Sequence, residues 1–107
     1  MYFKRAVIIP NYGFTVNIFE PNVMELHDLE EAWNKWAISK TIEDWQKIAE
    51  LWAKQIDTWD VTDRKDQKLE VTPENVATRP TVFIKALMDV LPDAFQGKPN
   101  PKPACAS

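Results

Sequence analysis

The most informative part of the sequence is TIEDWQKIAELWAKQIDTW, residues 41–59. Its apolar residues recur at steps of three and four with Glu and Lys between them, which is the pattern of an amphipathic helix. Thr41 followed by Asp44 marks the start, because a hydroxyl at the N-cap accepts a backbone hydrogen bond from the first turn. We therefore predict one helix from residue 42 to residue 59. Its tryptophans are seven residues apart and share a stripe, and we expect Trp45 and Trp52 to build the core.

Another helix is predicted just upstream, from about residue 23 to about residue 38. Asn22 with Glu25 three residues later is the signature of a capping box. Apolar residues follow at helical spacing as far as Trp36. Ser39-Lys40-Thr41 then interrupts the pattern, so two helices joined by a short turn are expected.

The N-terminal part predicts a β-hairpin. Residues 3–9 and 14–19 are rich in β-branched and aromatic side chains, and the second run alternates apolar with polar residues. Pro10-Asn11-Tyr12-Gly13 lies between them and supplies the residues that a tight turn needs.

Beyond residue 59 the chain predicts a loop and two further helices. The charged residues 63–68 cannot be buried, and they form the loop between two strand-like flanks. Thr72 followed by Pro73 starts a short helix, and Pro80 starts another whose apolar face runs to Leu91.

These elements predict an α+β fold, with an N-terminal β-hairpin packed on a small bundle of about four helices. Residues 1–95 are expected to form a single domain. Residues 96–107 contain three prolines and no apolar periodicity, so we expect a flexible, disordered tail.

The inventory of reactive residues argues against an enzyme. The chain has one cysteine, Cys105, and one histidine, His27, so an internal disulfide, a Cys-based zinc site and a multi-histidine metal site are excluded. The serines are Ser39, between two helices, and Ser107, at the end, and His27 is expected to be an exposed helix residue. No catalytic, cofactor-binding or metal-binding residue is predicted.

The charge is concentrated in one part of the chain. The net charge is −3, and residues 20–63 carry eleven acidic side chains against four lysines. This segment repels phosphate backbones, so binding to nucleic acid is disfavoured. It is either the solvated side of two helices or an electrostatic mimic of nucleic acid that inhibits a basic enzyme. The longest apolar run, Ala6–Ile9, is too short to cross a membrane, and we expect a soluble, cytoplasmic protein.

Five tryptophans and five phenylalanines are many for a chain of 107 residues. Some of these rings are expected to contact a protein partner, because tryptophan is enriched at binding hot spots. Our candidates are Trp33, Trp36, Trp59 and Phe83. Alanine at Trp33 or Trp36 is expected to weaken partner binding with little change in melting temperature. The inventory is also compatible with a homo-oligomer.

The C-terminal half resembles the tail assembly chaperones of long-tailed bacteriophages. The resemblance is carried by Trp-Asp-Val-Thr-Asp at residues 59–63, by Leu-Glu-Val-Thr-Pro-Glu-Asn-Val at residues 69–76, and by Pro80 with the apolar helix of residues 82–91. The turn Ile9-Pro10-Asn11-Tyr12-Gly13 and the sequence Phe19-Glu20-Pro21 are similar to the opening of some members.

The resemblance implies a non-enzymatic function in tail morphogenesis. Such chaperones bind the tape measure protein and tail tube subunits in the cytoplasm of the infected host, and they are absent from the mature virion. Two other functions remain open from the residues: an acidic inhibitor of a host defence or nucleic-acid enzyme, encoded by a phage or mobile element, and a structural head-tail component.

Overall fold

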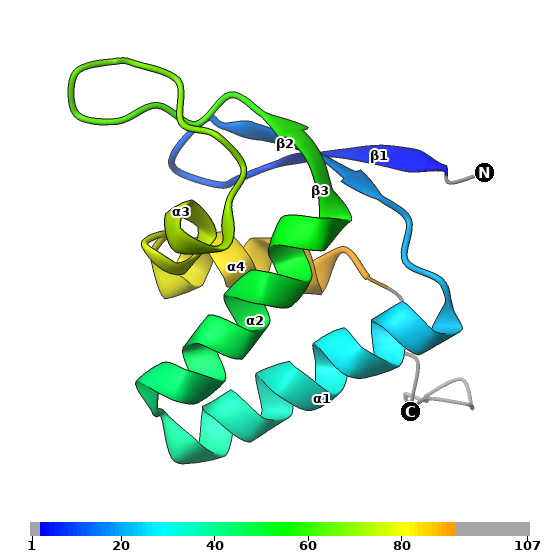
Figure 1. The fold of residues 1–107 in the computed structure, drawn as a ribbon. Coiled ribbons are helices and arrows are strands. Elements are labelled where there is room, and N and C mark those ends of the chain that lie inside the picture. Colours follow the sequence, from blue (N-terminus) through cyan, green and yellow to red (C-terminus); the bar gives the residue numbers. More distant parts are fainter. Residues whose placement is uncertain (1–2, 92–107) are drawn as a thin grey trace.

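The computed structural model describes residues 3–91 and shows an α+β fold (Figure 1). The predicted tail, residues 96–107, and the end of the predicted domain, residues 92–95, lie outside the described residues. The elements in chain order are β1 Lys4–Ile8, β2 Thr15–Phe19, α1 Val23–Ser39, α2 Ile42–Gln55, β3 Ile56–Trp59, α3 Pro73–Ala77 and α4 Thr81–Asp89.

The predicted β-hairpin is confirmed. β1 and β2 pair antiparallel, with Val7 opposite Val16. The connecting turn has positive φ at Asn11, 69°, and at Gly13, 73°. Asn and Gly enter this left-handed region more readily than other residues, which explains their place in the turn.

The end of the predicted helix of residues 42–59 is a strand, which corrects the prediction. α2 ends at Gln55, and β3 continues directly from it and pairs antiparallel with β2. The Gln55 side chain is buried, and its Nε2 donates to the carbonyl oxygen of Phe19 at 2.8 Å, where helix meets sheet. Pairing with β2 supplies the backbone hydrogen bonds that a longer helix would have made. The stripe of tryptophans on α2 therefore contains only Trp45 and Trp52.

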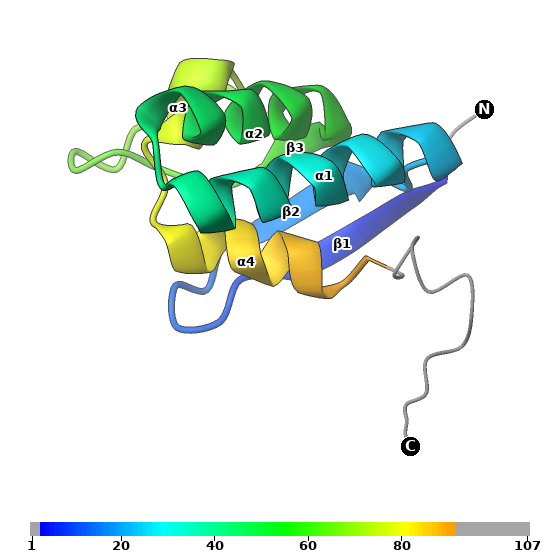
Figure 2. The ribbon, with the colours of Figure 1, turned by 90° about the horizontal axis from the view of Figure 1, so that it is seen from below.

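The sheet has the order β1-β2-β3, and the helices cover one of its faces (Figure 1). α1 and α2 form an antiparallel pair, and α4 runs beside β1 (Figure 2). The opposite face of β1 carries the exposed Lys4, Ala6 and Ile8. The core between sheet and helices includes Val7, Ile9, Val16, Ile18, Leu29, Ala32, Ile48, Trp52, Val61, Val76, Phe83, Ile84 and Leu87.

The helix starts read from the sequence are confirmed. Asn22 and Glu25 form a complete capping box at α1, and the hydroxyls of Thr41 and Thr72 cap α2 and α3. Among residues 3–91, no helix is long and apolar enough to cross a bilayer.

The charged loop of residues 63–68 is also confirmed, with flanks that meet in a β-bridge between Thr62 and Lys68. The Asp63 carboxylate accepts from the backbone N–H groups of Lys65 and Gln67, at 2.7 and 3.0 Å. These bonds hold the loop closed although its side chains face water.

Candidate functional site

The turn between α1 and α2 and the aromatic side chains next to it form the candidate site, which we call the helical tip (residues 33–45). Lys40 ends α1 in the left-handed conformation, φ 55°, and its N–H donates to the carbonyl oxygen of Trp36 at 2.8 Å. Thr41 then starts α2 as its N-cap. Two helices are thus joined through only two residues outside helical geometry, which fixes their relative direction.

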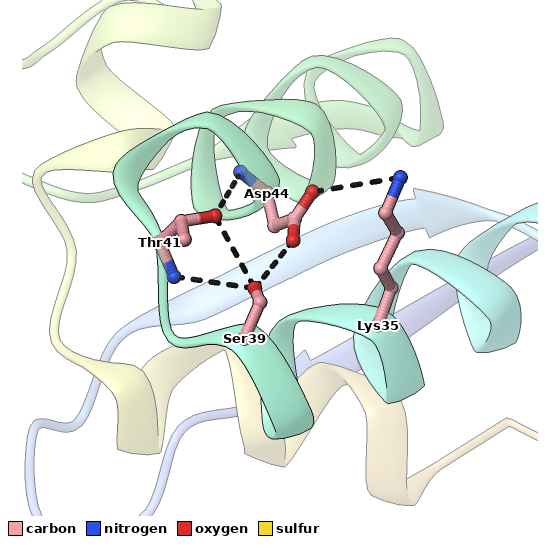
Figure 3. A network of polar contacts seen from close by, with 4 residues as sticks. All are labelled: Lys35, Ser39, Thr41 and Asp44. Carbon is pink, nitrogen blue, oxygen red and sulfur yellow. Dashed lines mark hydrogen bonds and ion pairs between the residues drawn. The ribbon is translucent and has the colours of Figure 1, made fainter.

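A network of polar contacts holds the turn between α1 and α2 in one conformation (Figure 3). The Ser39 hydroxyl donates to the Asp44 carboxylate and accepts from the Thr41 N–H at 3.2 Å. The Lys35 ammonium lies 3.8 Å from the other oxygen of Asp44. Side chains from the last turns of α1 are thereby tied to the first turn of α2.

The network lowers the pKa of Asp44. The hydrogen bond from Ser39 is the largest cause, partial burial opposes it, and the Thr41 side chain and the Lys35 charge lower the pKa further. The folded chain therefore holds the ionised carboxylate better than the unfolded chain does.

We expect the Asp44→Asn variant to be less stable than the parent at neutral pH, by an amount that shrinks in acid. A depressed folded-state pKa gives stability that is present above the unfolded pKa, about 3.9, and lost as pH falls through the folded pKa. Urea midpoints of both proteins measured between pH 7 and pH 2 test this. A difference that stays constant over this range would contradict it.

Three tryptophans form a cluster at the helical tip. The ring of Trp36 lies 5.4 Å from that of Trp33 and 4.9 Å from that of Trp45, between centroids. The Trp45 indole N–H donates to the carbonyl oxygen of Ala77 at 2.8 Å, and the Lys40 ammonium lies 4.2 Å from the Trp36 ring centroid. The cluster is half-buried and packs against the core, so removal of one ring is expected to lower stability. This corrects the expectation that alanine at Trp33 or Trp36 changes the melting temperature little.

Two isoleucines beside the turn are open to solvent. Ile38, in the last turn of α1, is 88% exposed, and Ile42, the first residue of α2, is 67% exposed. The sequence pattern placed Ile42 on the apolar stripe of its helix and did not single out Ile38. The sequence did contain an indication of this exposure. Ile38 lies outside the three-and-four spacing of the apolar residues of α1, so its side chain is expected to face solvent.

Two of the four partner-binding candidates lie in the core, which corrects their assignment to the surface. Trp59 is 2% exposed and Phe83 is 1% exposed. Their rings meet edge to face, with centroids 6.0 Å apart, and the Trp59 indole N–H donates to the carbonyl oxygen of Leu69 at 2.8 Å. Trp33 and Trp36 are the candidates that the structure brings together.

Many acidic side chains of residues 20–63 have structural partners. Glu25 completes the capping box of α1, the Asp44 carboxylate accepts from the Ser39 hydroxyl, and Asp63 closes the charged loop. Glu20 pairs with Arg5, Asp57 pairs with Lys4, and Asp60 accepts from the backbone N–H of Thr15. A surface that mimics nucleic acid needs carboxylates free to meet a basic partner, and these six are engaged within the chain.

His27 is an exposed residue of α1, as predicted. Ligand atoms of His27, Asp28 and Glu31 lie within 4.8 Å of one another, and all three residues are exposed. Exposed acidic groups commonly gather in this way without an ion, so we assign no metal to them.

Comparisons of the chain with protein-family models, with curated proteins and with solved structures found no match.

Proposed function

We propose that this chain is a non-enzymatic protein-binding protein and that the helical tip is its binding surface. The observation that carries the proposal is the exposure of Ile38 and Ile42, 88% and 67%, beside the cluster of three half-buried tryptophans. Removal of apolar surface from water favours association, roughly in proportion to the apolar area buried. Tryptophan and large aliphatic side chains at one end of a helical pair therefore offer a site for an apolar partner.

The locked turn supports the same proposal. A surface that is ordered before binding loses little conformational entropy when it binds. The hydrogen bonds that tie Ser39, Thr41 and Asp44 together order the backbone that joins the two isoleucines. The tip thus presents its apolar side chains in a set arrangement.

The partner we propose is an apolar helical segment of a phage tail protein, the tape measure protein or a tail tube subunit. This follows from the resemblance to tail assembly chaperones, and the tip has the apolar chemistry that such a segment needs. On this proposal the protein works in the cytoplasm of the infected host and leaves before the virion is complete. We do not propose the acidic inhibitor, because so many of its carboxylates are engaged within the chain.

Replacing both Ile38 and Ile42 with Ser is expected to weaken binding at least about tenfold, because the apolar contact is lost. The test is co-expression of the full chain with the tape measure protein that the chaperone proposal expects a neighbouring gene to encode, followed by an affinity measurement on the purified pair. Val23→Ser with Met24→Ser is the matched control, since these residues are 76% and 71% exposed at the other end of α1.

The outcomes separate the two parts of the proposal. Equal affinities for both double variants would overturn the helical tip as the binding surface. If the parent neither binds the tape measure protein or the tail tube subunit nor raises the soluble yield of either, the chaperone function is wrong.

A further inference from the structure

β1 is an open edge of the sheet. Ile9 N–H donates to the carbonyl oxygen of Phe14 at 2.9 Å, and Glu20 N–H donates to that of Phe3 at 2.6 Å, so odd-numbered residues of this strand bond to β2. The backbone groups of its even-numbered residues, Lys4, Ala6 and Ile8, therefore point away from β2. Within residues 3–91, no strand pairs with this side of β1.

The charged side chains of β1 do not prevent this edge from pairing with another strand. Charged side chains that project from an edge strand normally discourage pairing with another chain. Here the Lys4 ammonium reaches back across the sheet to Asp57 at 3.1 Å. The Arg5 guanidinium binds Glu20 and donates to the carbonyl oxygen of Val90 at 2.6 Å. Both positive charges are thus held against their own chain.

We propose that a second copy of this chain docks on β1, antiparallel and in the register that places Ala6 opposite Ala6 of the second copy. A two-fold axis passes through this pair, and the two sheets join into one. Lys4 faces Ile8 of the second copy, so no like charges meet directly across the new ladder. The small Ala6 side chain at the axis lets the two backbones approach.

A groove beside β1 completes the interface. It measures about 300 Å³ and lies between β1 and α4, with Pro10, Val82, Ala86 and Val90 among its lining residues. Val82 is 55% exposed at its rim, and Phe3 at the start of the edge is 75% exposed.

The proposed register brings Phe3 to this groove. Phe3 falls opposite Ile9 of the second copy, three residues from the Ala6 pair at the centre of the register. Side chains alternate along a strand, so Phe3 projects to the helix-covered face, as Val7 and Ile9 do. At that position the groove of the second copy is open to receive its ring. The two-fold axis gives this contact twice.

This surface is separate from the helical tip, and the inference is independent of the phage partner. The tip lies where α1 meets α2, in the helical layer. β1 is an edge strand of the sheet, which is the other layer of the fold (Figure 1). A dimer of this kind would carry two tips.

A disulfide across the axis tests the register. In a background with Cys105→Ser, which removes the single native cysteine, Ala6→Cys is expected to form a covalent dimer under mild oxidation. Residues opposite each other in a hydrogen-bonded pair have Cα atoms about 5.5 Å apart, within disulfide range. Lys4→Cys is the control, because the two copies of residue 4 would lie about 13 Å apart along the strand direction and would not link.

Sedimentation equilibrium of the full chain tests the affinity. We expect a dimer that Phe3→Ser weakens at least about tenfold. Val23→Ser is expected to leave it unchanged, since Val23 is 76% exposed on α1, away from the edge. Ala6→Pro removes an outward N–H that β2 does not use, and is expected to abolish the dimer.

Three results would overturn the inference. The first is a monomer at all concentrations up to about 100 μM, which would leave the edge to another segment of the chain or to another protein. The second is a dimer that survives both Phe3→Ser and Ala6→Pro. The third is equal cross-linking of Ala6→Cys and Lys4→Cys.

Discussion

Replacing Trp52 with Ala is expected to lower the free energy of unfolding by about 3–5 kcal/mol. Trp52 is fully buried, 0% exposed, on the side of α2 that faces the sheet. Its removal leaves a cavity that neighbouring side chains fill only in part, and small domains have about 5–15 kcal/mol of stability in total. Urea unfolding followed by circular dichroism measures the change.

Trp52→Phe is expected to cost much less than Trp52→Ala. The Trp52 indole nitrogen is buried without a hydrogen-bond partner among the described residues. A buried donor without a partner is unfavourable by about 1–3 kcal/mol, and phenylalanine removes it while filling most of the space. Equal losses for the alanine and phenylalanine variants would show that the indole donor makes a stabilising bond.

Replacing Trp59 with Ala is expected to lower the free energy of unfolding by a similar amount, about 3–5 kcal/mol. The change removes a buried ring and its edge-to-face contact with Phe83, and it leaves the carbonyl oxygen of Leu69 without its donor. Thermal and urea unfolding give the measurement. A variant of unchanged stability with weakened partner binding would restore Trp59 to the binding surface.

Trp59→Phe separates the polar contribution from the packing. At this position the indole N–H has a partner, the carbonyl oxygen of Leu69 at 2.8 Å, so phenylalanine loses a hydrogen bond. At Trp52 the same substitution removes a donor that has no partner among the described residues. We therefore expect Trp59→Phe to be the more destabilising of the two.

The candidate site was only partly accessible from the sequence. Trp33 and Trp36 were recognised as surplus aromatic residues, and they lie together at the helical tip. Ile38 and Ile42 were missed, because spacing along one helix predicts which residues share a side but not how far that helix is covered by others. Phe83 was predicted to contact a partner although it lies in the core, since exposure depends on neighbours that are distant in sequence.

Features that depend on residues close together in the chain were predictable from the sequence alone. Capping residues at Asn22, Thr41 and Thr72 place the helix starts, and the Asn11 to Gly13 turn makes the β-hairpin, because these hydrogen bonds and dihedral preferences are local. The expectation of binding rather than catalysis comes from the inventory of reactive side chains and stays a prediction.

The end of α2 and the solvent exposure of the apolar side chains depend on the tertiary structure. Residues 56–59 have helical spacing, yet β2, about forty residues earlier in the chain, offers them backbone partners and a buried face, and they become a strand. The same packing buries Trp59 and leaves the edge of β1 open. Long-range hydrogen bonds and burial outweigh a local preference of a few tenths of a kcal/mol per residue, about the range of intrinsic helix propensities.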